Sequence, residues 1–466
     1  MFDSRYPVMH NGVHTHIDDF GGGGAPLKTI KIDLHAVPRV EGDVGFTIEV
    51  ENNQLKKVLV GPHEPPRFIE HVLRGHHYNE APIIASKICG ICWAPHFLAS
   101  VQAVEKALEI TPTLQTRTLR EILLLATILQ SNIQHSVLLS LPDLLRLPNA
   151  FPLVESIPEV FAIVRKLERL GNDITQALSG RDVGGIAFTV GGMLTVPEEK
   201  KIEELIRRVE DAKREIFTLA GVFKTHLTPE KTLAFSRERE FISLTPSKDD
   251  TGYIYTGGMY CSSDTGSVPI TIENYLAHTN ERYPDGSTGK FTRHVRNSVT
   301  VGSLARFVNN YEHLCSEAKT AARIFGLERR DFRIAMNPVA QVVEAVDAIY
   351  RLEKELKKIL LLGIKKETIP KMVNLGENLR EGVGIVEAPR GLLIHHYTLR
   401  GEKIEKANCI VPTGQNYGSM QDDIEFILPT YLKEGLDDAE IQFRAEKIIR
   451  DHDPCSSCAV HFLRKK

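Results

Sequence analysis

The chain has 466 residues, a formal net charge of −3, 42% hydrophobic and 25% charged residues. This composition is typical of a soluble globular protein with a large core, and the near-neutral charge gives no support to nucleic-acid binding. The longest apolar stretch, residues 122–129, falls well short of the roughly 18–20 residues that cross a bilayer, so no direct membrane span is predicted.

The N-terminal residues 1–26 contain three histidines, several aspartates and a run of glycines. We expect a flexible extension there, with a metal site at the histidines as the weaker alternative. From residue 30 apolar and polar residues alternate on both sides of Asn52 and Asn53. This pattern predicts two antiparallel strands joined by a turn, and hence a small N-terminal sheet.

Most of the remaining chain carries apolar residues at spacings of three and four, which predicts long helices packed in a bundle. The predicted helices cover residues 96–110, 115–140, 155–179, 198–223, 303–325 and 339–363. Residues 226–300 suggest β-hairpins or loops, and residues 375–420 suggest an irregular, Gly- and Pro-rich stretch. The expected fold class is α+β, predominantly α, with one large domain at 27–461 and a short tail at 462–466.

Seven cysteines occur, and their odd number argues against a disulfide framework. Four form two C-x-x-C pairs at opposite ends of the chain: Cys89 with Cys92, and Cys455 with Cys458. Four thiolates could bind one metal, as in a structural zinc site, whereas a thioredoxin-like dithiol would need only one pair. A shared site would join both ends of the domain through its core.

Six motifs together resemble the large, catalytic subunit of nickel–iron hydrogenases, in the order found in that family. They are PRVEG (38–42), PRFIE (66–70), KICGIC (87–92), EAPRG (387–391), CIVPTGQN (409–416) and DPCSSCAVH (453–461). The resemblance implies the fold of that subunit and a reversible conversion of H2 into protons and electrons.

The resemblance assigns the four paired cysteines to a nickel–iron centre. Cys89 and Cys455 would be terminal nickel ligands, and Cys92 and Cys458 would bridge nickel to an iron that carries one CO and two cyanides. Soft thiolate ligands suit such metals. Cys261 and Cys315 receive no role, because unpaired cysteines usually behave as small hydrophobic residues.

The iron ligands need a pocket, which the family builds from two further motifs. Thr413 would donate a hydrogen bond to one cyanide, with Pro412 and Pro389 beside it. Arg390 would lie over the open metal site as a fixed cation; the alternative is an ordinary surface arginine. Asp453 resembles an aspartate that the family places near this arginine.

A second, hard-metal site is implied by the side chains of Glu70 and His461 and the backbone carbonyl of Cys409. Oxygen ligands suit Mg²⁺, and iron (Fe²⁺) is the alternative in the family.

Heterolytic cleavage of H2 needs a base close to the metal. The resemblance implies that the proton passes to the Cys455 thiolate and then to Glu41, with Arg390 as a rival first base. For Glu41 a solvated carboxylate at a strand end is the alternative. His96 is expected to donate to a cysteine sulfur or to orient the loop, unless it is a satisfied core histidine, and His135 follows the same logic.

The chain lacks a further cysteine cluster for iron–sulfur centres and a G-x-G-x-x-G nucleotide motif. Electrons should therefore leave through an iron–sulfur small subunit, with further electron-transfer subunits beyond it. A maturation endopeptidase is a further implied partner, since the family is trimmed after the histidine that matches His461.

Departures from the family pattern, such as Lys87 in place of an arginine and Gly184-Gly185 in place of a His-Pro, indicate a cytoplasmic, multi-subunit, cofactor-coupled branch or a divergent relative. Two alternatives stay open besides a structural zinc protein. One is a regulatory H2 sensor with the same metal site and slow turnover, and the other is a structural relative from respiratory complexes.

Overall fold

The computed structural model describes residues 14–17, 28–64, 68–247, 255–285, 287–370 and 375–460. The helices are α1 (Ile69–Val72), α2 (Ala81–Ala85), α3 (Trp93–Ala107), α4 (Leu114–Ile133), the π-helix η1 (Gln134–Ser140), α5 (Leu141–Leu144), α6 (Leu153–Ser156), α7 (Pro158–Ser179), α8 (Glu199–His226), α9 (Pro229–Thr232), α10 (Tyr275–His278), α11 (Ser303–Asn310), the 3-10 turns η2 (Tyr311–His313) and η3 (Ile334–Met336), α12 (Ser316–Phe325), α13 (Asn337–Leu362), α14 (Pro412–Lys433), α15 (Asp438–Asp451) and α16 (Ser456–Ala459). The strands are β1 (His14–Ile17), β2 (Lys28–Leu34), β3 (Val44–Glu51), β4 (Gln54–Pro62), β5 (Phe188–Thr189), β6 (Gly192–Met193), β7 (Glu240–Thr245), β8 (Met259–Ser262), β9 (Gly266–Val268), β10 (Asn280–Arg282), β11 (Phe291–Arg293), β12 (Val299–Thr300), β13 (Leu379–Ala388), β14 (Gly391–Arg400) and β15 (Lys403–Ile410).

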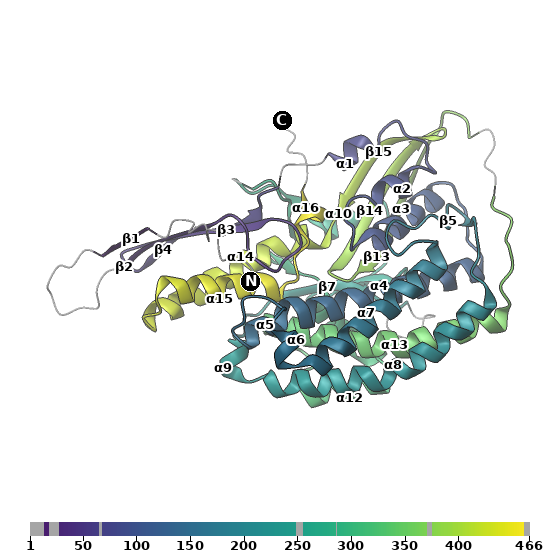
Figure 1. Cartoon of the computed structure of the whole chain (residues 1–466). Coiled ribbons are helices and arrows are strands. Elements are labelled where there is room, and N and C mark those ends of the chain that lie inside the picture. Colours follow the sequence, from purple (N-terminus) through teal and green to yellow (C-terminus); the bar gives the residue numbers. More distant parts are fainter. Residues whose placement is uncertain are drawn as a thin grey trace, which may run out of the picture.

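Four long helices form the body of the molecule (Figure 1). Helix α4 packs against α7, α7 against α8, α8 against α13, and α13 against α4, so the four close into a bundle. Their apolar residues recur at spacings of three and four and are buried along the shared faces. The predicted α+β fold with a predominantly α bundle is confirmed.

Residues 303–325 form two helices instead of the single helix that periodicity predicted. Helix α11 ends at Asn310, the turn η2 follows, and α12 starts at Ser316. The Cys315 sulfur accepts a hydrogen bond from the backbone N–H of Ala318, 3.4 Å away, and so caps the new helix. The prediction was wrong because the helical spacing of apolar residues continues across the break between the two helices. The break depends on local capping contacts, which the spacing does not reveal.

The segment from α4 to α5, Leu114–Leu144, is long and apolar enough to cross a membrane, and its most apolar 18-residue window has a mean hydropathy of 1.5. However, 78% of its most apolar window is buried inside the protein. Such a helix satisfies the same length and composition test when it lies in the core of a globular protein.

The N-terminal strands form an antiparallel sheet in the order β1-β2-β3-β4. Asn52 and Asn53 both have positive φ (52° and 62°) and form the predicted turn between β3 and β4, as a two-residue hairpin loop requires. Strand β1 pairs with β2, so within the expected N-terminal extension these four residues form a strand. The rest of residues 1–26, apart from this strand, and the tail 462–466 lie outside the described residues.

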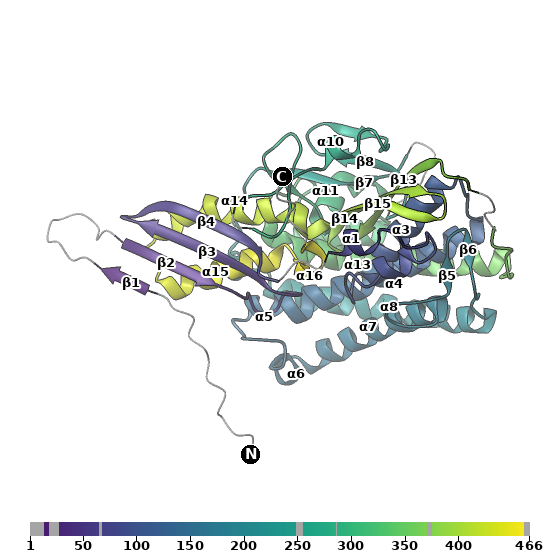
Figure 2. The ribbon, with the colours of Figure 1, turned by 90° about the horizontal axis from the view of Figure 1, so that it is seen from above.

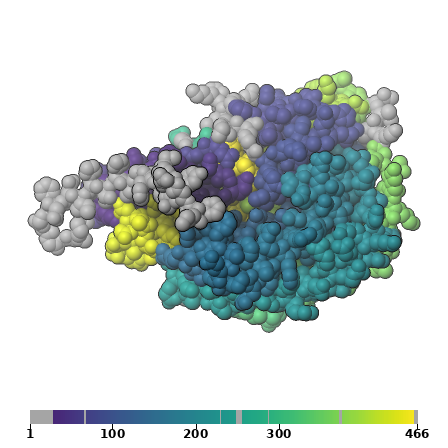
Figure 3. All heavy atoms as spheres, viewed as in Figure 1, coloured from purple at the N-terminus to yellow at the C-terminus, as the bar shows by residue number. Residues whose placement is uncertain are grey.

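This sheet projects from the body together with the last helices of the chain. Strand β4 packs on α14 and β2 contacts α15, and both views show the sheet running beside these helices (Figures 1 and 2). In the space-filling view the purple N-terminal strands and the yellow C-terminal residues lie side by side on the left (Figure 3). The two ends of the chain therefore meet, as a shared cysteine site requires.

Residues 375–420, predicted to be irregular, contain the three-stranded antiparallel sheet β13-β14-β15 and the start of α14. The glycines that suggested a loop have a packing role instead. A Cβ on Gly382 would lie 2.1 Å from the backbone oxygen of Ala103, and one on Gly384 would lie 1.9 Å from that of Ala99. Glycine thus lets β13 press directly against the backbone of α3, and the prediction of irregular structure was wrong.

Residues 226–300 follow the prediction of hairpins and loops more closely. Strands β7, β8 and β9 form an antiparallel meander, with β12 added in parallel beside β7, and β10 pairs with β11.

A candidate metal centre

The four paired cysteines meet in one buried cluster. Their ligand atoms all lie within 4.8 Å of one another. Cys89 and Cys92 come from the loop that leads into α3, where Cys92 occupies the N-cap position, and Cys455 and Cys458 come from the last segment around α16. The sulfur of Cys455 lies 3.4 Å from that of Cys89 and 2.8 Å from that of Cys458.

Backbone contacts hold the C-terminal segment in this position. Glu41 forms an isolated parallel bridge with Cys455, and the backbone oxygen of Glu41 accepts from the N–H of Ser456 at 2.9 Å. The N–H of Cys455 donates to the hydroxyl oxygen of Thr413 at 2.8 Å. The segment is thereby clamped between the loop before β3 and the first turn of α14.

The charge state of the cluster points to a cation. Hydrogen bonds from the thiols of Cys455, Cys458 and Cys92 lower the pKa of Cys89 far below its usual value. Burial raises the pKa of Cys455 and of Cys458 well above theirs. Burial therefore opposes ionisation of Cys455 and Cys458, and bound metal ions would replace the protons of these thiols.

Arg390 is the cation built into the cluster. Its guanidinium donates to the sulfur of Cys92 at 3.2 Å through Nη1 and to Oδ1 of Asp453 at 3.1 Å through Nε. Only 4% of its surface is exposed, which contradicts the alternative of a surface arginine. Burial alone would lower the pKa of Arg390, but Asp453 and the neighbouring cysteines raise it well above its usual value.

Asp453 is itself fixed from several sides. Its backbone has a positive φ of 52°, and its Oδ2 accepts from Nε2 of Gln341 at 2.8 Å. Nε2 of His135 lies 3.7 Å from Oδ1 of Asp453 and 2.9 Å from the backbone oxygen of Arg450. His135, which lies in the π-helix η1, therefore contacts the aspartate beside Arg390 and belongs to the surroundings of the centre.

Glu41 lies at the edge of the cluster and is half-buried. Its Oε1 is 4.0 Å from the sulfur of Cys89 and accepts a short hydrogen bond from the hydroxyl of Ser457, whose N–H lies 3.3 Å from Oε2. Its side chain thus faces Cys89, while its backbone pairs with Cys455. The transfer of a proton from Cys455 to Glu41 remains a prediction.

Ser457 was not identified from the sequence. It lies between the two cysteines of the C-terminal pair. A hydroxyl at that position could have been predicted to donate a hydrogen bond to a carboxylate near the cluster.

His96 is buried in α3 and points toward a second histidine. Its Nδ1 lies 3.1 Å from Nε2 of His395, whose Nδ1 lies 2.7 Å from the hydroxyl of Tyr397. This chain of contacts joins α3 to β14, so a role in orienting the loop that carries Cys89 and Cys92 fits the structure. The expected hydrogen bond to a cysteine sulfur stays a prediction.

The remaining residues of the predicted iron pocket come from two turns. Pro389 and Arg390 are the two residues that connect β13 to β14. Pro412 and Thr413 open α14, where proline fits the first turn because its missing N–H has no helical partner. The hydroxyl of Thr413 accepts from Cys455, which leaves its own hydrogen for another acceptor.

Glu70 and Cys409, two of the predicted hard-metal residues, line a cavity of about 550 Å³ that also borders Cys458. Oε1 of Glu70 accepts from the N–H of Cys409 at 2.8 Å, so these two residues are adjacent, and their role as metal ligands stays a prediction. His461, the third predicted ligand, lies outside the described residues.

Lys290, which sequence reasoning missed, reaches the same carboxylate. Its Nζ lies 3.3 Å from Glu70 and 3.1 Å from Glu281. Burial would lower the pKa of Lys290, but the two carboxylates raise it above its usual value. Burial raises the pKa of Glu281 to about 7 despite this lysine.

The fold and the buried four-cysteine cluster define a protein with a candidate metal site that joins both ends of its chain. A family model described as nickel-dependent hydrogenase matches residues 67–151 and 212–461. The chain is 29% identical to the alpha chain of sulfhydrogenase 2 of Pyrococcus furiosus, over 93% of this chain and 99% of that one. It is 27% identical to a component of the F420-non-reducing hydrogenase of Methanothermobacter thermautotrophicus, over 93% and 95%.

A solved structure of an NAD+-reducing NiFe-hydrogenase in the H2-reduced state shares the fold, with a TM-score of 0.82 and 23% identity over 92% of this chain and 99% of that one. The chain belongs to the nickel-dependent hydrogenase family. It is accordingly an oxidoreductase that acts on H2.

The four-thiol cluster fits a nickel–iron centre by its donor chemistry, because soft sulfur ligands are what these metals take in proteins. The family match favours nickel over structural zinc.

Proposed function

We propose that this chain is the catalytic large subunit of a cytoplasmic, multi-subunit nickel–iron hydrogenase. The observation that carries the proposal is the buried cluster of four cysteines with Arg390 donating to one of its sulfurs. The family match and the relatives named as components of hydrogenases support it.

In this proposal Cys89 and Cys455 hold nickel as terminal ligands, and Cys92 and Cys458 also hold iron. When bound, a nickel–iron centre with CO and two cyanides on iron supplies the Lewis acidity and the redox change that H2 cleavage requires.

Thr413, with Pro412 and Pro389, forms the surroundings of the diatomic ligands in this proposal. The hydroxyl of Thr413 already accepts from the N–H of Cys455, so its hydrogen is available for a cyanide nitrogen.

The protein's own residues would handle the proton. A thiolate at the centre accepts it first, and Glu41 takes it onward; Arg390, the rival first base, is disfavoured because its raised pKa keeps the guanidinium protonated. Ser457 supports this role because its hydroxyl and N–H hold both oxygens of the Glu41 carboxylate at the edge of the cluster. All four cysteines and Arg390 are buried, and burial strengthens the electrostatic effect of the fixed guanidinium.

Electrons would leave through an iron–sulfur small subunit, followed by further electron-transfer subunits. Within the part of the chain that the structure describes, the four-cysteine cluster is the only group of His, Cys, Asp and Glu side chains assembled closely enough to hold a metal ion. The chain therefore needs a partner to carry electrons beyond it. The relatives named as subunits support a multi-subunit type, and the NAD+-reducing hydrogenase among the solved structures supports a cofactor-coupled one.

A Mg²⁺ ion, or Fe²⁺, would bind the Glu70 carboxylate, the Cys409 carbonyl and His461. The adjacency of Glu70 and Cys409 supports this assignment. Lys290 already balances part of the negative charge there, so the ion would share Glu70 with the lysine.

Infrared spectroscopy of the purified complex, combined with turnover of H2 with an artificial acceptor, tests the proposal. We expect stretching bands from one CO and two cyanides, together with rapid dye reduction. Bands without turnover would instead indicate an H2 sensor, and zinc without such bands would contradict the proposal.

A further inference from the structure

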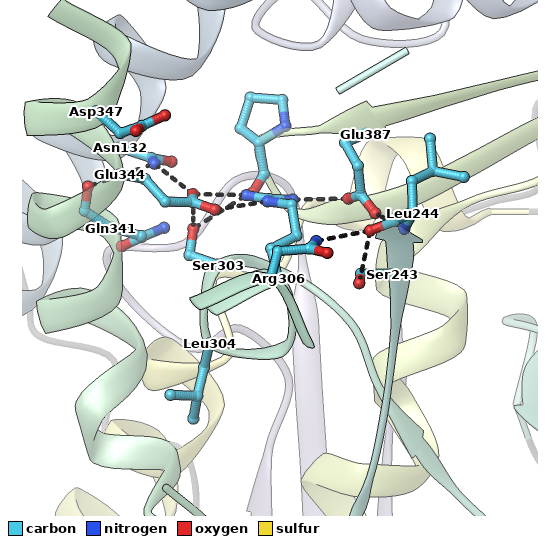
Figure 4. Close-up of polar contacts among 12 residues, drawn as sticks. Asn132, Ser243, Leu244, Ser303, Leu304, Arg306, Gln341, Glu344, Asp347 and Glu387 are labelled. Carbon is cyan, nitrogen blue, oxygen red and sulfur yellow. Dashed lines mark hydrogen bonds and ion pairs between the residues drawn. The ribbon is translucent and has the colours of Figure 1, made fainter. Parts of the chain in front are cut away.

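Arg306 lies at the centre of a fully buried polar network (Figure 4). It comes from α11, and its side chain, like those of Glu344 and Glu387, is 0% exposed. Nε and Nη2 pair with the two oxygens of Glu344 at 2.7 and 2.8 Å, and Nη1 pairs with Glu387 at 2.8 Å. Such a fork-shaped, charge-assisted arrangement fixes the plane of the guanidinium.

The same guanidinium also holds the turn that carries Arg390. Nη1 donates to the backbone oxygen of Ala388 at 2.9 Å, and Nη2 donates to that of Pro389 at 2.8 Å. These are the two carbonyls that directly precede Arg390 in the turn between β13 and β14. Because each peptide unit is planar, fixing both carbonyls fixes the peptide plane that carries the N and Cα atoms of Arg390.

Backbone packing supports the turn from its other side. Gly302 has a φ of 115°, and a Cβ there would lie 3.2 Å from the backbone oxygen of Arg390. Gly391 has a φ of 129°, and its Cβ would lie 2.7 Å from the backbone N of Gly302. The turn is thus enclosed between the start of α11 and the Arg306 guanidinium.

The surrounding network holds Arg306 in its place. The hydroxyl of Ser303 lies 3.1 Å from Nη2 of Arg306 and donates to Glu344 at 2.6 Å. The other oxygen of Glu387 accepts from the N–H of Leu244 at 2.7 Å. Buried charges of this kind seldom add much stability over apolar packing, so a geometric role is the better explanation for them here.

We propose that Arg306 is a positioning residue for H2 cleavage: by holding the carbonyls of Ala388 and Pro389, it aims the Arg390 guanidinium at the Cys92 sulfur. This rests on the proposed function, in which Arg390 acts over the metal centre. The network fixes the backbone from which the Arg390 side chain extends, and Asp453 holds the guanidinium at the other end of that side chain. A displacement on the order of 1 Å at a catalytic group can cost about 10²-fold in rate.

The test compares Arg306→Lys with the matched control Arg120→Lys in the complete, purified complex. Arg120 is also a buried arginine, bidentate to Glu105 at 2.7 and 2.8 Å and donating to the backbone oxygen of Thr189 at 3.1 Å. Lysine keeps the charge in both cases but cannot form the fork.

For Arg306→Lys we expect normal nickel and iron contents, shifted CO and cyanide infrared bands, and a turnover about 10²-fold lower. For Arg120→Lys we expect unshifted bands and normal turnover in the folded fraction. A double-mutant cycle with Arg390→Lys completes the test, since residues that act through one another are not additive. Adding Arg306→Lys to Arg390→Lys should reduce turnover by less than about twofold.

Unshifted bands with normal turnover in Arg306→Lys, or additive losses in the cycle, would overturn the inference while leaving the proposed function intact. Wild-type complex without nickel would instead overturn the proposed function. If Arg306→Lys does not yield folded complex, Ser303→Ala, which removes one contact to Nη2, should shift the same bands by a smaller amount; unshifted bands there would also reject the inference.

Discussion

Two regions around the C-terminal segment differ in how their charge is balanced. In the cysteine cluster, four buried thiols face one guanidinium, that of Arg390, which Asp453 already shares. Around Glu70, by contrast, the ammonium of Lys290 lies between two carboxylates. The first region needs metal ions to become fully ionised, whereas the second has an internal cation.

This contrast predicts different roles for a bound metal in the cysteine cluster and near Glu70. Loss of metal from the cysteine cluster would leave thiolates that must take up protons, because burial opposes their charge. Loss of a cation near Glu70 would leave a paired carboxylate. We therefore expect the cysteine cluster to be decisive for activity and the Glu70 region to tune stability.

The largest expected effect comes from Cys458→Ser. A hydroxyl is a poor substitute for a soft thiolate, so nickel should be lost and H2 turnover should fall to background. Elemental analysis of the purified complex measures this. Cys261→Ser is the control, because Cys261 is buried but lies outside the cluster; a Cys458→Ser enzyme that retains nickel and turnover would refute the assignment.

Gly384→Ala should have the next largest effect. Its Cβ would meet the backbone oxygen of Ala99 at 1.9 Å, which forces β13 away from α3. Because Cys92 precedes α3 and Arg390 follows β13, both stability and nickel retention should fall, stability by about 3 kcal/mol. Thermal unfolding and nickel content measure these, and Gly376→Ala, where nothing lies within 4 Å although φ is positive, offers a strained but uncrowded control.

Lys290→Gln sharpens the contrast at the second region. Without the ammonium, Glu70 and Glu281 lose their internal cation, so the protein should depend more on a divalent cation. Saturating Mg²⁺ should then stabilise the variant by up to about 2.7 kcal/mol at 100-fold excess over Kd. Melting temperatures with Mg²⁺ and with a chelator measure this; equal Mg²⁺ effects in wild type and variant would show that Lys290 does not substitute for a cation.

The smallest effect concerns pH and Glu387. Burial raises the pKa of Glu387 to about 7, although Arg306 opposes the shift. A carboxyl whose pKa is raised on folding favours the folded state at low pH, so its contribution is lost as the pH rises. Between pH 5 and 7 this amounts to about 2 kcal/mol. Chemical denaturation at both pH values should show this loss in wild type but not in Glu387→Gln. If the free energy of unfolding of the variant fell by the same amount between the two pH values, the prediction would be contradicted.

The cysteine cluster could be predicted from the sequence because metal ligands occur in short local motifs. Two C-x-x-C pairs and the Pro389-Arg390 dipeptide are recognisable wherever the fold places them. The long helices were predictable for a similar reason, since a buried helix face repeats locally along the chain.

Features that depend on distant partners were not predictable in this way. Nothing near Lys290 in the sequence pairs it with Glu70, which is 220 residues away. Gly382 and Gly384 suggested a loop, yet their lack of a side chain serves the contact with α3. Arg306 carries no motif, and its role follows only from the carbonyls that the fold brings to it.

X-ray absorption at the nickel edge of the purified complex tests the central claim most directly, namely that Cys89, Cys92, Cys455 and Cys458 together hold nickel beside iron. We predict a nickel surrounded by sulfur ligands with an iron neighbour, and the loss of one sulfur or of all nickel in Cys458→Ser. A protein that contains zinc bound by the four sulfurs, with neither nickel nor iron, would contradict the account.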